Sequence, residues 1–275
     1  MPSQVWFITG ASSGFGRAFA HYAIDQGYSI AIGARRTDKL NEIAQKAPER
    51  VLALPLDVND PSQVEAAAHQ ALNRFGRIDV LINNAGYGIV GAVEETPESD
   101  LRAQMDTNFF GAVSVTRAFL SSFRAQRSGA IVNISSLGGQ LSVAGFGAYS
   151  ASKFALEGIS EALAQELRPF GVKVLIVEPG QFRTDLAGGA MKHMPQITAY
   201  SETVGPTRDF AHAMDHTQPG DPYKAARAID IALRDPNTPL RLPLGEDAVA
   251  AIRGHAENLL AELGKWRALA EETKI

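Results

Sequence analysis

The sequence predicts an α/β fold in three layers, with helices on both faces of a doubly wound, mainly parallel sheet of about seven strands. Two observations carry this prediction. Short apolar runs alternate with longer helical patterns along most of the chain, which is the order of βαβ units. The apolar runs contain few polar residues, as strands buried on both faces do. Because no charged linker or low-complexity segment divides the chain, we expect residues 1–275 to form a single domain.

The predicted elements follow one another in a regular order. The first apolar run, VWFIT at 5–9, precedes a helical pattern that Gly27 ends, and Pro61 suits the first turn of the third helix. One long helix or two consecutive helices should fill residues 98–127. The predicted strands cover residues 5–9, 28–33, 51–54, 79–82, 130–135, 172–177 and 240–243, and the other predicted helices cover 15–26, 37–46, 61–75, 148–169, 222–234 and 247–270.

Two segments depart from this alternation. Residues of about 186–222 show no clear period and mix Met191, Met194, Tyr200 and Phe210 with polar residues. An irregular segment of this length in a compact domain is usually functional, so we predict a lid over a substrate site. Residues of about 245–275 should form a C-terminal helical extension.

A glycine-rich turn, TGASSGFG at 9–16, joins the first strand to the first helix. Glycines allow a tight turn and let the backbone approach a phosphate, while a helix N-terminus favours an anion. In open parallel sheets, ligands bind beyond the carboxyl ends of the strands, where this turn lies. An ordinary βα turn is the alternative interpretation. The residues expected to contact a cofactor here are Gly10, Ser12, Ser13, Gly14, Phe15 and Gly16.

The stretch 129–153, GAIVNISSLGGQLSVAGFGAYSASK, has no charged residue before Lys153, although 20% of the chain is charged. It comprises a predicted strand, the two serines Ser135 and Ser136, a glycine-rich loop and the start of a helix. On a helix, Tyr149 and Lys153 are four residues apart and lie on one face. A hydroxyl at a strand end, beside a phenol and an ammonium, suits proton transfer to or from a carbonyl or an alcohol.

Together these motifs resemble the short-chain dehydrogenase/reductase family in its non-extended form, in the family's order over roughly the first 185 residues. The turn is similar to the family's TGxxxGxG, residues 83–86 read NNAG, and Ser136 precedes Tyr149 by 13 positions, as the family's catalytic serine precedes its tyrosine. The segments VWFITGASSGFG, NNAGYG and RLPLGEDAV resemble the 17-beta-hydroxysteroid-dehydrogenase-like branch. The resemblance implies a Rossmann-type fold and an oxidoreductase that uses a nicotinamide cofactor.

The resemblance also bears on the choice of cofactor. Ala34 stands where NAD-binding relatives carry an Asp for the adenosine ribose, and Arg35 and Arg36 follow. Guanidinium groups suit a phosphate, so we expect NADP(H), with Arg35 as the direct contact; two solvated arginines are the alternative. Asp57 could equally cap a turn. The other cofactor-binding residues implied by the family are Asp57, Val58, Asn84, Ala85, Gly86, Tyr149, Lys153, Pro179, Gly180 and Thr184.

The family's catalytic residues match Asn108, Ser136, Tyr149 and Lys153. The resemblance implies that Tyr149 is the general acid/base, that Ser136 binds the substrate oxygen, and that Asn108 anchors a water beside Lys153. A phenol with a pKa of ~10 exchanges protons poorly near neutral pH. We expect the Lys153 ammonium to lower the pKa of Tyr149. Ser135 is expected to have a structural role.

The expected substrate is a small apolar ketone or aldehyde, or the corresponding alcohol. Leu137, Phe146 and Phe182 should join Ser136 and Tyr149 around it, although such side chains could equally be ordinary packing. Two other functions share part of the pattern: a 3-oxoacyl-carrier-protein reductase-like enzyme and a non-enzymatic NADP-binding regulator. The presence of serine, tyrosine and lysine together argues against the regulator.

Composition argues against several other classes of function. The net charge is −4 with no long basic patch, so we expect neither nucleic acid nor a membrane as a partner. Cysteine is absent, and His212 with His216 has no evident third ligand, so no metal is expected. Because there is no signal-peptide pattern and no run of ~18 apolar residues, we expect a cytoplasmic protein. Small residues on helix 148–163, with the helix around 101–124, predict a homodimer or homotetramer surface, unless they pack within the chain.

Overall fold

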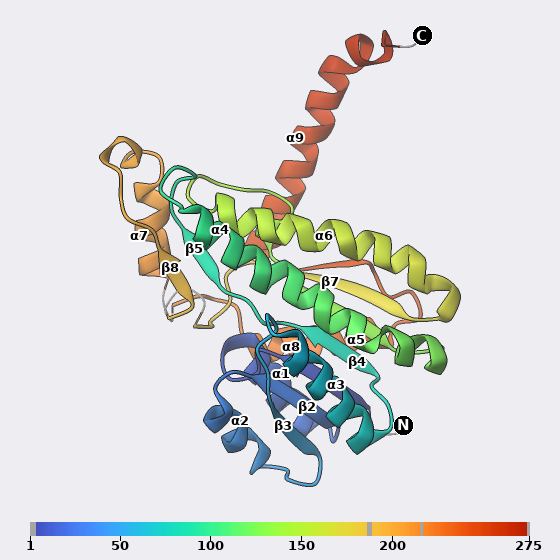
Figure 1. The fold of residues 1–275 in the computed structure, drawn as a ribbon. Helices are drawn as coiled ribbons and strands as arrows, with labels where there is room; N and C mark the ends of the chain where they lie inside the picture. The colour runs from blue at the N-terminus through green and yellow to red at the C-terminus, as the bar shows by residue number, and fades with distance from the viewer. Residues whose placement is uncertain (1–3, 186–188, 215–216, 274–275) are drawn as a thin grey trace.

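A parallel sheet of seven strands lies at the centre of the computed structural model, which describes residues 4–185, 189–214 and 217–273 (Figure 1). The strand order is β3-β2-β1-β4-β6-β7-β9, so the order reverses between β1 and β4. This reversal is the switch point of a doubly wound sheet, and it confirms the predicted fold class. The strands are β1 (Val5–Thr9), β2 (Ser29–Ala34), β3 (Val51–Pro55), β4 (Val80–Asn83), β6 (Ala130–Ile134), β7 (Lys173–Pro179) and β9 (Arg241–Leu244).

The two faces of the sheet are covered by separate hydrophobic cores. Alternate side chains of β1 enter them: Trp6 belongs to one core and Phe7 to the other, where its ring lies 4.8 Å from that of Phe119. This alternation follows from the two-residue period of a strand. The first core includes α1 (Gly14–Asp25), α2 (Thr37–Ala44) and α8 (Pro222–Arg234), and the second includes α3 (Pro61–Phe75), α5 (Gly111–Gln126) and α6 (Gly147–Leu167).

Local capping explains why α3 begins and ends close to its predicted limits. The Asp60 carboxylate accepts hydrogen bonds from the backbone N–H groups of Ser62 (2.9 Å) and Gln63 (3.3 Å), and Pro61 occupies the first turn. Gly76 follows the helix with a φ of 76°, a left-handed conformation that glycine adopts without strain. The chain is thereby directed into β4.

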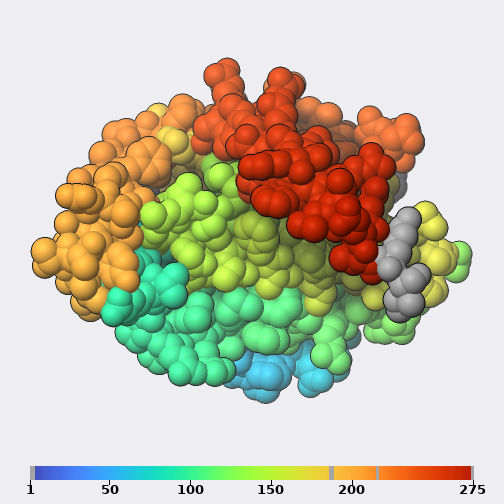
Figure 2. Space-filling view, turned by 90° about the horizontal axis from the view of Figure 1, so that it is seen from above, coloured from blue at the N-terminus to red at the C-terminus, as the bar shows by residue number. Residues whose placement is uncertain are grey.

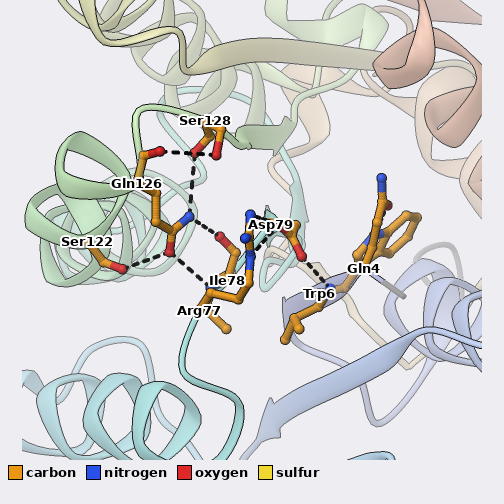
Figure 3. A network of polar contacts seen from close by, with 9 residues as sticks. Gln4, Trp6, Arg77, Ile78, Asp79, Ser122, Gln126 and Ser128 are labelled. Atoms are coloured by element: carbon orange, nitrogen blue, oxygen red, sulfur yellow. Dashed lines mark hydrogen bonds and ion pairs between the residues drawn. The ribbon is translucent and has the colours of Figure 1, made fainter. Parts of the chain in front are cut away.

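Polar contacts fix the amino-terminal end of the sheet (Figure 3). Asp79, just before β4, accepts hydrogen bonds from the backbone N–H of Val5 (2.8 Å) and from Arg77 Nε (2.9 Å). Gln126, at the end of α5, donates to the carbonyl oxygen of Ile78 (2.8 Å). These contacts hold β1 and β4 together, and the opposite ends of these two strands form the switch point.

The segment expected to be one or two helices divides into three pieces. It consists of α4 (Glu98–Met105), a π-helical turn (Asp106–Phe110) and α5. A π-helical turn adds a residue to the helical repeat and often occurs at functional sites. Asn108 lies within it. Nothing in the sequence period distinguishes this turn from an ordinary helix.

The segment 186–222 is more regular than expected, although residues 186–188 and 215–216 lie outside the described part of the chain. It contains β8 (Met191–His193), a short 3-10 turn (Thr198–Tyr200) and α7 (Gly205–Ala213). The strand β8 pairs in parallel with β5 (Gly88–Val90), about a hundred residues earlier. The sequence prediction missed both strands because three residues are too few to show a period.

A buried ion pair anchors this segment to the body of the protein. Arg208 on α7 lies 2.6 Å from Glu95, and both side chains are almost fully buried. Glu95 also accepts hydrogen bonds from the backbone N–H groups of Ala92 (2.6 Å) and Ile197 (2.7 Å). Burial alone would raise the pKa of Glu95, but these hydrogen bonds and the Arg208 charge outweigh it and lower the pKa. We refer to residues 189–214, the described part of the segment expected to be a lid, as the cap.

The final helix, α9 (Glu246–Glu271), projects away from the sheet (Figure 1) and lies at the surface when seen from that end (Figure 2). Ala248 is its one fully buried residue within the part that is described. The helix lies within the segment of about 245–275 for which a C-terminal helical extension was expected. None of the helices within the described ranges combines the length and apolarity needed to cross a bilayer.

Candidate active site

One cleft of about 1690 Å³ opens at the carboxyl ends of the strands, around the switch point. It is larger than the ~300–1,000 Å³ of ordinary ligand pockets, so it can hold an extended cofactor together with a substrate. Gly16 and Asn108 are the two predicted site residues that do not line it. The others do: Gly10, Ser12, Ser13, Gly14, Phe15, Arg35, Arg36, Asp57, Val58, Asn84, Ala85, Gly86, Ser136, Leu137, Phe146, Tyr149, Lys153, Pro179, Gly180, Phe182 and Thr184.

The glycine turn has the geometry that a phosphate requires. Gly10 and Gly14 have φ values of 67° and 51°, which other residues rarely adopt. A Cβ on Gly16 would lie 2.5 Å from the carbonyl oxygen of Gly10, so Gly16 allows the turn to pack closely against α1. The side chain of Ser13, which precedes α1, makes no capping hydrogen bond. The first N–H groups of α1 therefore suit an anion, and these residues fit a dinucleotide phosphate.

Two arginines flank this turn at the end of β2. Arg36 donates hydrogen bonds to the hydroxyls of Ser12 (3.2 Å) and Ser13 (3.0 Å). Arg35 lines the same cleft and is exposed, while the preceding Ala34 is buried. The structure thus brings both predicted arginines to one end of the cleft, with the guanidinium of Arg36 already held over the turn.

The NNAG segment fixes the floor of the cleft. Asn84 Nδ2 donates to the carbonyl oxygen of Thr9 (2.9 Å), and the backbone N–H of Asn84 donates to the Thr9 hydroxyl (2.9 Å). Asn83 Nδ2 donates to Asn133 Oδ1 (2.8 Å) on β6. Asp57 accepts a hydrogen bond from the backbone N–H of Asn59 (3.0 Å), so it stabilises a turn while it also lines the cleft. Asparagine side chains thus join the ends of β1, β4 and β6.

Ser136, Tyr149 and Lys153 converge on the middle of the cleft. Ser136 follows β6 and accepts a hydrogen bond from the backbone N–H of Gly138 (3.0 Å). Tyr149 and Lys153 lie one turn apart on α6, and Lys153 Nζ is 5.8 Å from the centre of the Tyr149 ring. Lys153 is buried and donates to the carbonyl oxygen of Ile134 (2.8 Å). The predicted group therefore assembles from two elements that follow one another in the chain.

Asn108 is held behind this group by the π-helical turn. Its Oδ1 accepts from the backbone N–H of Tyr87 (3.1 Å), and its Nδ2 donates to the carbonyl oxygen of Tyr87 (3.0 Å) and to Ser152 Oγ (3.0 Å). Gly86 separates it from Lys153: a Cβ on Gly86 would lie 3.0 Å from Asn108 Oδ1 and 3.8 Å from Lys153 Nζ. Asn108 is thus close to the ammonium and held firmly in place.

The pKa of Tyr149 differs from the expectation based on the sequence. Withdrawal from solvent raises its pKa above the ordinary value, and a hydrogen bond with Ser136 only partly opposes this rise. Contrary to the expectation from the sequence, the pKa of Tyr149 is raised and not lowered in this structure, because burial outweighs the influences that favour the phenolate. Burial also lowers the pKa of Lys153 to about 8, against the opposing charge of Glu157.

The predicted substrate side is largely apolar. The ring of Phe146 lies 6.2 Å from that of Tyr149, and Leu137 lines the cleft beside Ser136. Phe182 lies 5.2 Å from the ring of Phe15, so it packs next to the glycine turn rather than beside Tyr149. Residues of the cap that the sequence analysis did not assign also line the cleft. One of them, Lys192, forms an ion pair with Asp100 of α4, which lines the cleft as well.

One of the two histidines considered as metal ligands contacts another histidine. His212 stacks on His193, with ring centres 4.1 Å apart, while His216 lies outside the described residues. Across the described ranges, no three His, Cys, Asp or Glu side chains gather as metal ligands would.

Sequence reasoning missed a group of buried charges behind the cleft. Glu157 on α6 and Glu178 on β7 both contact Arg241 on β9, and the two carboxylates are almost fully buried. Two signals could have found them. Glu178 is an acidic residue in the apolar run KVLIVEP, and Glu157 follows Lys153 by one helical turn.

Comparison with known proteins identifies the family. The profile described as short chain dehydrogenase matches residues 4–195. The chain belongs to the short-chain dehydrogenase family. A solved short-chain dehydrogenase from Streptomyces avermitilis is 50% identical, with a TM-score of 0.95 and 99% of each chain covered. The oxidoreductase BOA17 of Botryotinia fuckeliana is 40% identical, with 98% of each chain covered.

The names of two further relatives mention a substrate or a cofactor. A 3-ketodihydrosphingosine reductase of Bacteroides thetaiotaomicron is 39% identical, with 89% of each chain covered. A short chain dehydrogenase/reductase from Burkholderia phymatum, solved in complex with NAD, is 26% identical, with a TM-score of 0.83 and 94% of this chain and 95% of that chain covered. This short-chain dehydrogenase is thus an oxidoreductase, and it shares its fold with a relative solved in complex with NAD.

Proposed function

We propose that this short-chain dehydrogenase is an NADP(H)-dependent enzyme that interconverts a hydrophobic ketone or aldehyde and its alcohol by hydride transfer. The observation that carries the proposal is the convergence of Ser136, Tyr149 and Lys153 in one cleft with the glycine turn. A phosphate-binding turn, a buried ammonium and a phenol one helical turn from that ammonium are the parts that carbonyl reduction needs. The 3-ketodihydrosphingosine reductase among the relatives supports a ketone substrate.

When bound, the nicotinamide cofactor supplies or receives the hydride. The residues of the chain handle the proton and the charge. Ser136 donates a hydrogen bond to the substrate oxygen, where negative charge develops. Tyr149 gives its phenolic proton to that oxygen as the carbonyl carbon gains the hydride, and takes the proton back in the reverse direction. Lys153 stabilises the resulting phenolate while its ammonium is charged.

The choice of NADP(H) rests on residues at the end of β2. Arg35 and Arg36 place two positive charges beside the glycine turn, and Ala34 provides no carboxylate for a ribose 2′-hydroxyl. We assign Arg35 as the direct contact to a 2′-phosphate because Arg36 is already hydrogen-bonded to Ser12 and Ser13. Asp57, Val58, Pro179, Gly180 and Thr184 are proposed to complete the cofactor site.

We further propose that the protein is a homo-oligomer and that a second copy of the chain covers an apolar stripe of α9. Ile252, Ala256, Leu259, Leu263, Trp266 and Ala270 repeat at intervals of three and four residues, the spacing of a coiled-coil seam. Leu263 is 64% exposed and Trp266 58% exposed, although such side chains favour burial. A parallel pair of these helices would bring Glu262 of one copy to Arg267 of the other, so the flanking charges complement a copy of the same helix.

The small residues of α6 that were expected to form an interface are partly buried within the chain and partly exposed. Ala148 and Ser152 are buried within the chain, where Ser152 accepts a hydrogen bond from Asn108, whereas Ala151 and Gly158 are exposed. Packing within the chain thus accounts for part of the small-residue face, and its exposed part is available for a second contact between copies.

Replacement of Tyr149 tests the proposed chemistry. We expect Tyr149→Phe to lower turnover by ~10²-fold or more while leaving NADPH affinity almost unchanged, because the lost group moves a proton rather than holding the cofactor. NADPH absorbance with a panel of ketones, aldehydes and acyl thioesters measures turnover, and titration of fluorescence measures binding. An active Phe variant would refute the assignment. Preference for acyl thioesters would indicate a 3-oxoacyl-carrier-protein reductase, and no turnover of any substrate by the unchanged protein would indicate a regulator.

Charge reversal at position 35 tests the cofactor. We expect Arg35→Asp to raise the Kd for NADPH by ~10-fold or more and to change that for NADH little, because the lost partner is a charged one. Arg36→Asp serves as the matched control and should have the smaller effect. Equal weakening of both cofactors by Arg35→Asp would contradict the proposed phosphate contact.

Glutamate substitutions on α9 test the proposed interface. We expect Leu259→Glu with Leu263→Glu to reduce the molar mass in light scattering, because a seam between apolar helices does not tolerate unpaired charges. The control is Ala261→Glu with Ala268→Glu, on the opposite side of the same helix, which should leave the mass unchanged. An unchanged mass for the leucine variant, or a monomeric parent protein, would overturn the proposal.

A further inference from the structure

The buried carboxylates of Glu157 and Glu178 lie directly behind the residues assigned to catalysis. Glu157 follows Lys153 by one turn of α6, and Glu178 precedes Pro179 at the end of β7. Their side chains are 6% and 1% exposed. Acidic residues are rarely buried to this extent unless they have partners, so the contacts of this pair indicate its role.

Two donors bridge the same two carboxylate oxygens. Arg241 Nε lies 3.1 Å from Glu157 Oε2 and 3.2 Å from Glu178 Oε1. Gln140 Nε2 donates to the same oxygens, at 3.2 Å and 2.9 Å. Arg241 reaches the surface through a second ion pair, with Glu161 at 2.5 Å. The pair therefore connects α6, β7 and β9 to the loop that carries Ser136.

Glu157 also supports this loop from inside. A Cβ on Gly139 would lie 2.5 Å from Ser135 Oγ and 3.1 Å from Glu157 Oε1. Both groups therefore approach the loop closely at Gly139, three residues after Ser136. On the other side, the Glu157 charge acts on Lys153 and raises the pKa that burial lowers.

The charged side chains around the Glu157–Glu178 pair come from α6, β9 and α9. Lys153 and Glu161 face it from α6, Arg241 from β9, and Asp247 of α9 lies nearby through its hydrogen bond to the backbone N–H of Gln181 (2.7 Å). Glu178 Oε2 accepts no hydrogen bond from any described residue. Burial, and then the Glu157 charge, raise the pKa of Glu178 to about 7. Burial raises the pKa of Glu157 as well, against a hydrogen bond from Ser135, the charge of Arg241 and a hydrogen bond from Gln140. The two carboxylates therefore titrate together.

We propose that Glu157 and Glu178 are positioning residues of the hydride-transfer site: Glu157 keeps Lys153 in its charged form, and Glu178 with Gln140 fixes the loop that carries Ser136. The expected effect of the two glutamates on catalysis rests on the proposed function. The expected effect of Glu157 on the charge of Lys153 does not. The role beside Lys153 is assigned to Glu157 because Glu157 is the carboxylate one helical turn from the ammonium. Removal of its negative charge leaves a buried ammonium with a carbonyl oxygen as its remaining partner.

The experiment compares Glu157→Gln, Glu178→Gln and Glu161→Gln. Without the Glu157 charge, the pKa of Lys153 should fall further, so the ammonium is lost at a lower pH as pH rises. In Glu157→Gln we expect the high-pH limb of kcat for ketone reduction to move to lower pH by about half a unit or more. Glu178→Gln should leave that limb in place, because the carboxylate charge that acts on Lys153 is that of Glu157. Glu161→Gln, the exposed partner of the same arginine, is the matched control and should also leave it unchanged.

A readout that needs no turnover separates this proposal from the proposed function. The pKa of Lys153 can be followed by NMR of the full chain labelled with ¹³C-lysine, with Lys153→Arg identifying the signal. Glu157→Gln should lower that pKa, and Glu161→Gln should not. A merely structural role would lower the melting temperature and kcat of Glu157→Gln without moving the titration, and would overturn the proposal. If Glu157→Gln does not fold, Glu157→Met, an uncharged side chain of similar length, takes its place in the same titration and must lower the pKa of Lys153; an unchanged value overturns the proposal.

Discussion

A buried ammonium determines what this cleft can do. Lys153 lies in surroundings that disfavour its charge, and its compensation comes from the carbonyl oxygen of Ile134 and from the charge of Glu157 one turn away. Its pKa of about 8 leaves it charged at neutral pH but close to its limit. An ammonium held in this state stabilises a phenolate on the neighbouring Tyr149 more strongly than it would in water, because the interaction is poorly screened. Residues of the glycine turn, of the NNAG segment and of the cap line the same cleft as this charge.

The opposing shift of Tyr149 follows from the same burial. In the cleft as described, withdrawal from solvent raises the pKa of the phenol, so the neutral form is favoured. A neutral phenol is the form that donates a proton to a carbonyl oxygen, and the charged lysine then favours the phenolate that remains. The pKa shifts of Tyr149 and Lys153 therefore suit reduction of a carbonyl group. Ser136 is positioned to donate a hydrogen bond to the same carbonyl oxygen.

Much of this arrangement could be predicted from the sequence because its parts are local. The strands are continuous apolar runs, the glycine turn and the NNAG segment are contiguous, and Tyr149 and Lys153 share one helix face, so the family pattern placed nearly all predicted residues around one cleft. What escaped prediction depends on contacts distant in sequence: the pairing of β5 with β8, the anchoring of α7 by Glu95 and Arg208, and the meeting of Glu157, Glu178 and Arg241. The direction of the Tyr149 pKa shift escaped too, because burial is a property of the packed structure.

The claim that this short-chain dehydrogenase reduces a carbonyl by hydride transfer from NADPH has a direct test. The unchanged protein would be given NADPH carrying two deuterium atoms at C4 of the nicotinamide, with a hydrophobic ketone that it turns over. Mass spectrometry and NMR of the product would locate the label. One deuterium on the carbinol carbon of the alcohol is the predicted result, because the cofactor supplies the hydride and Tyr149 supplies only the hydroxyl proton. An alcohol without deuterium at that carbon would contradict the account.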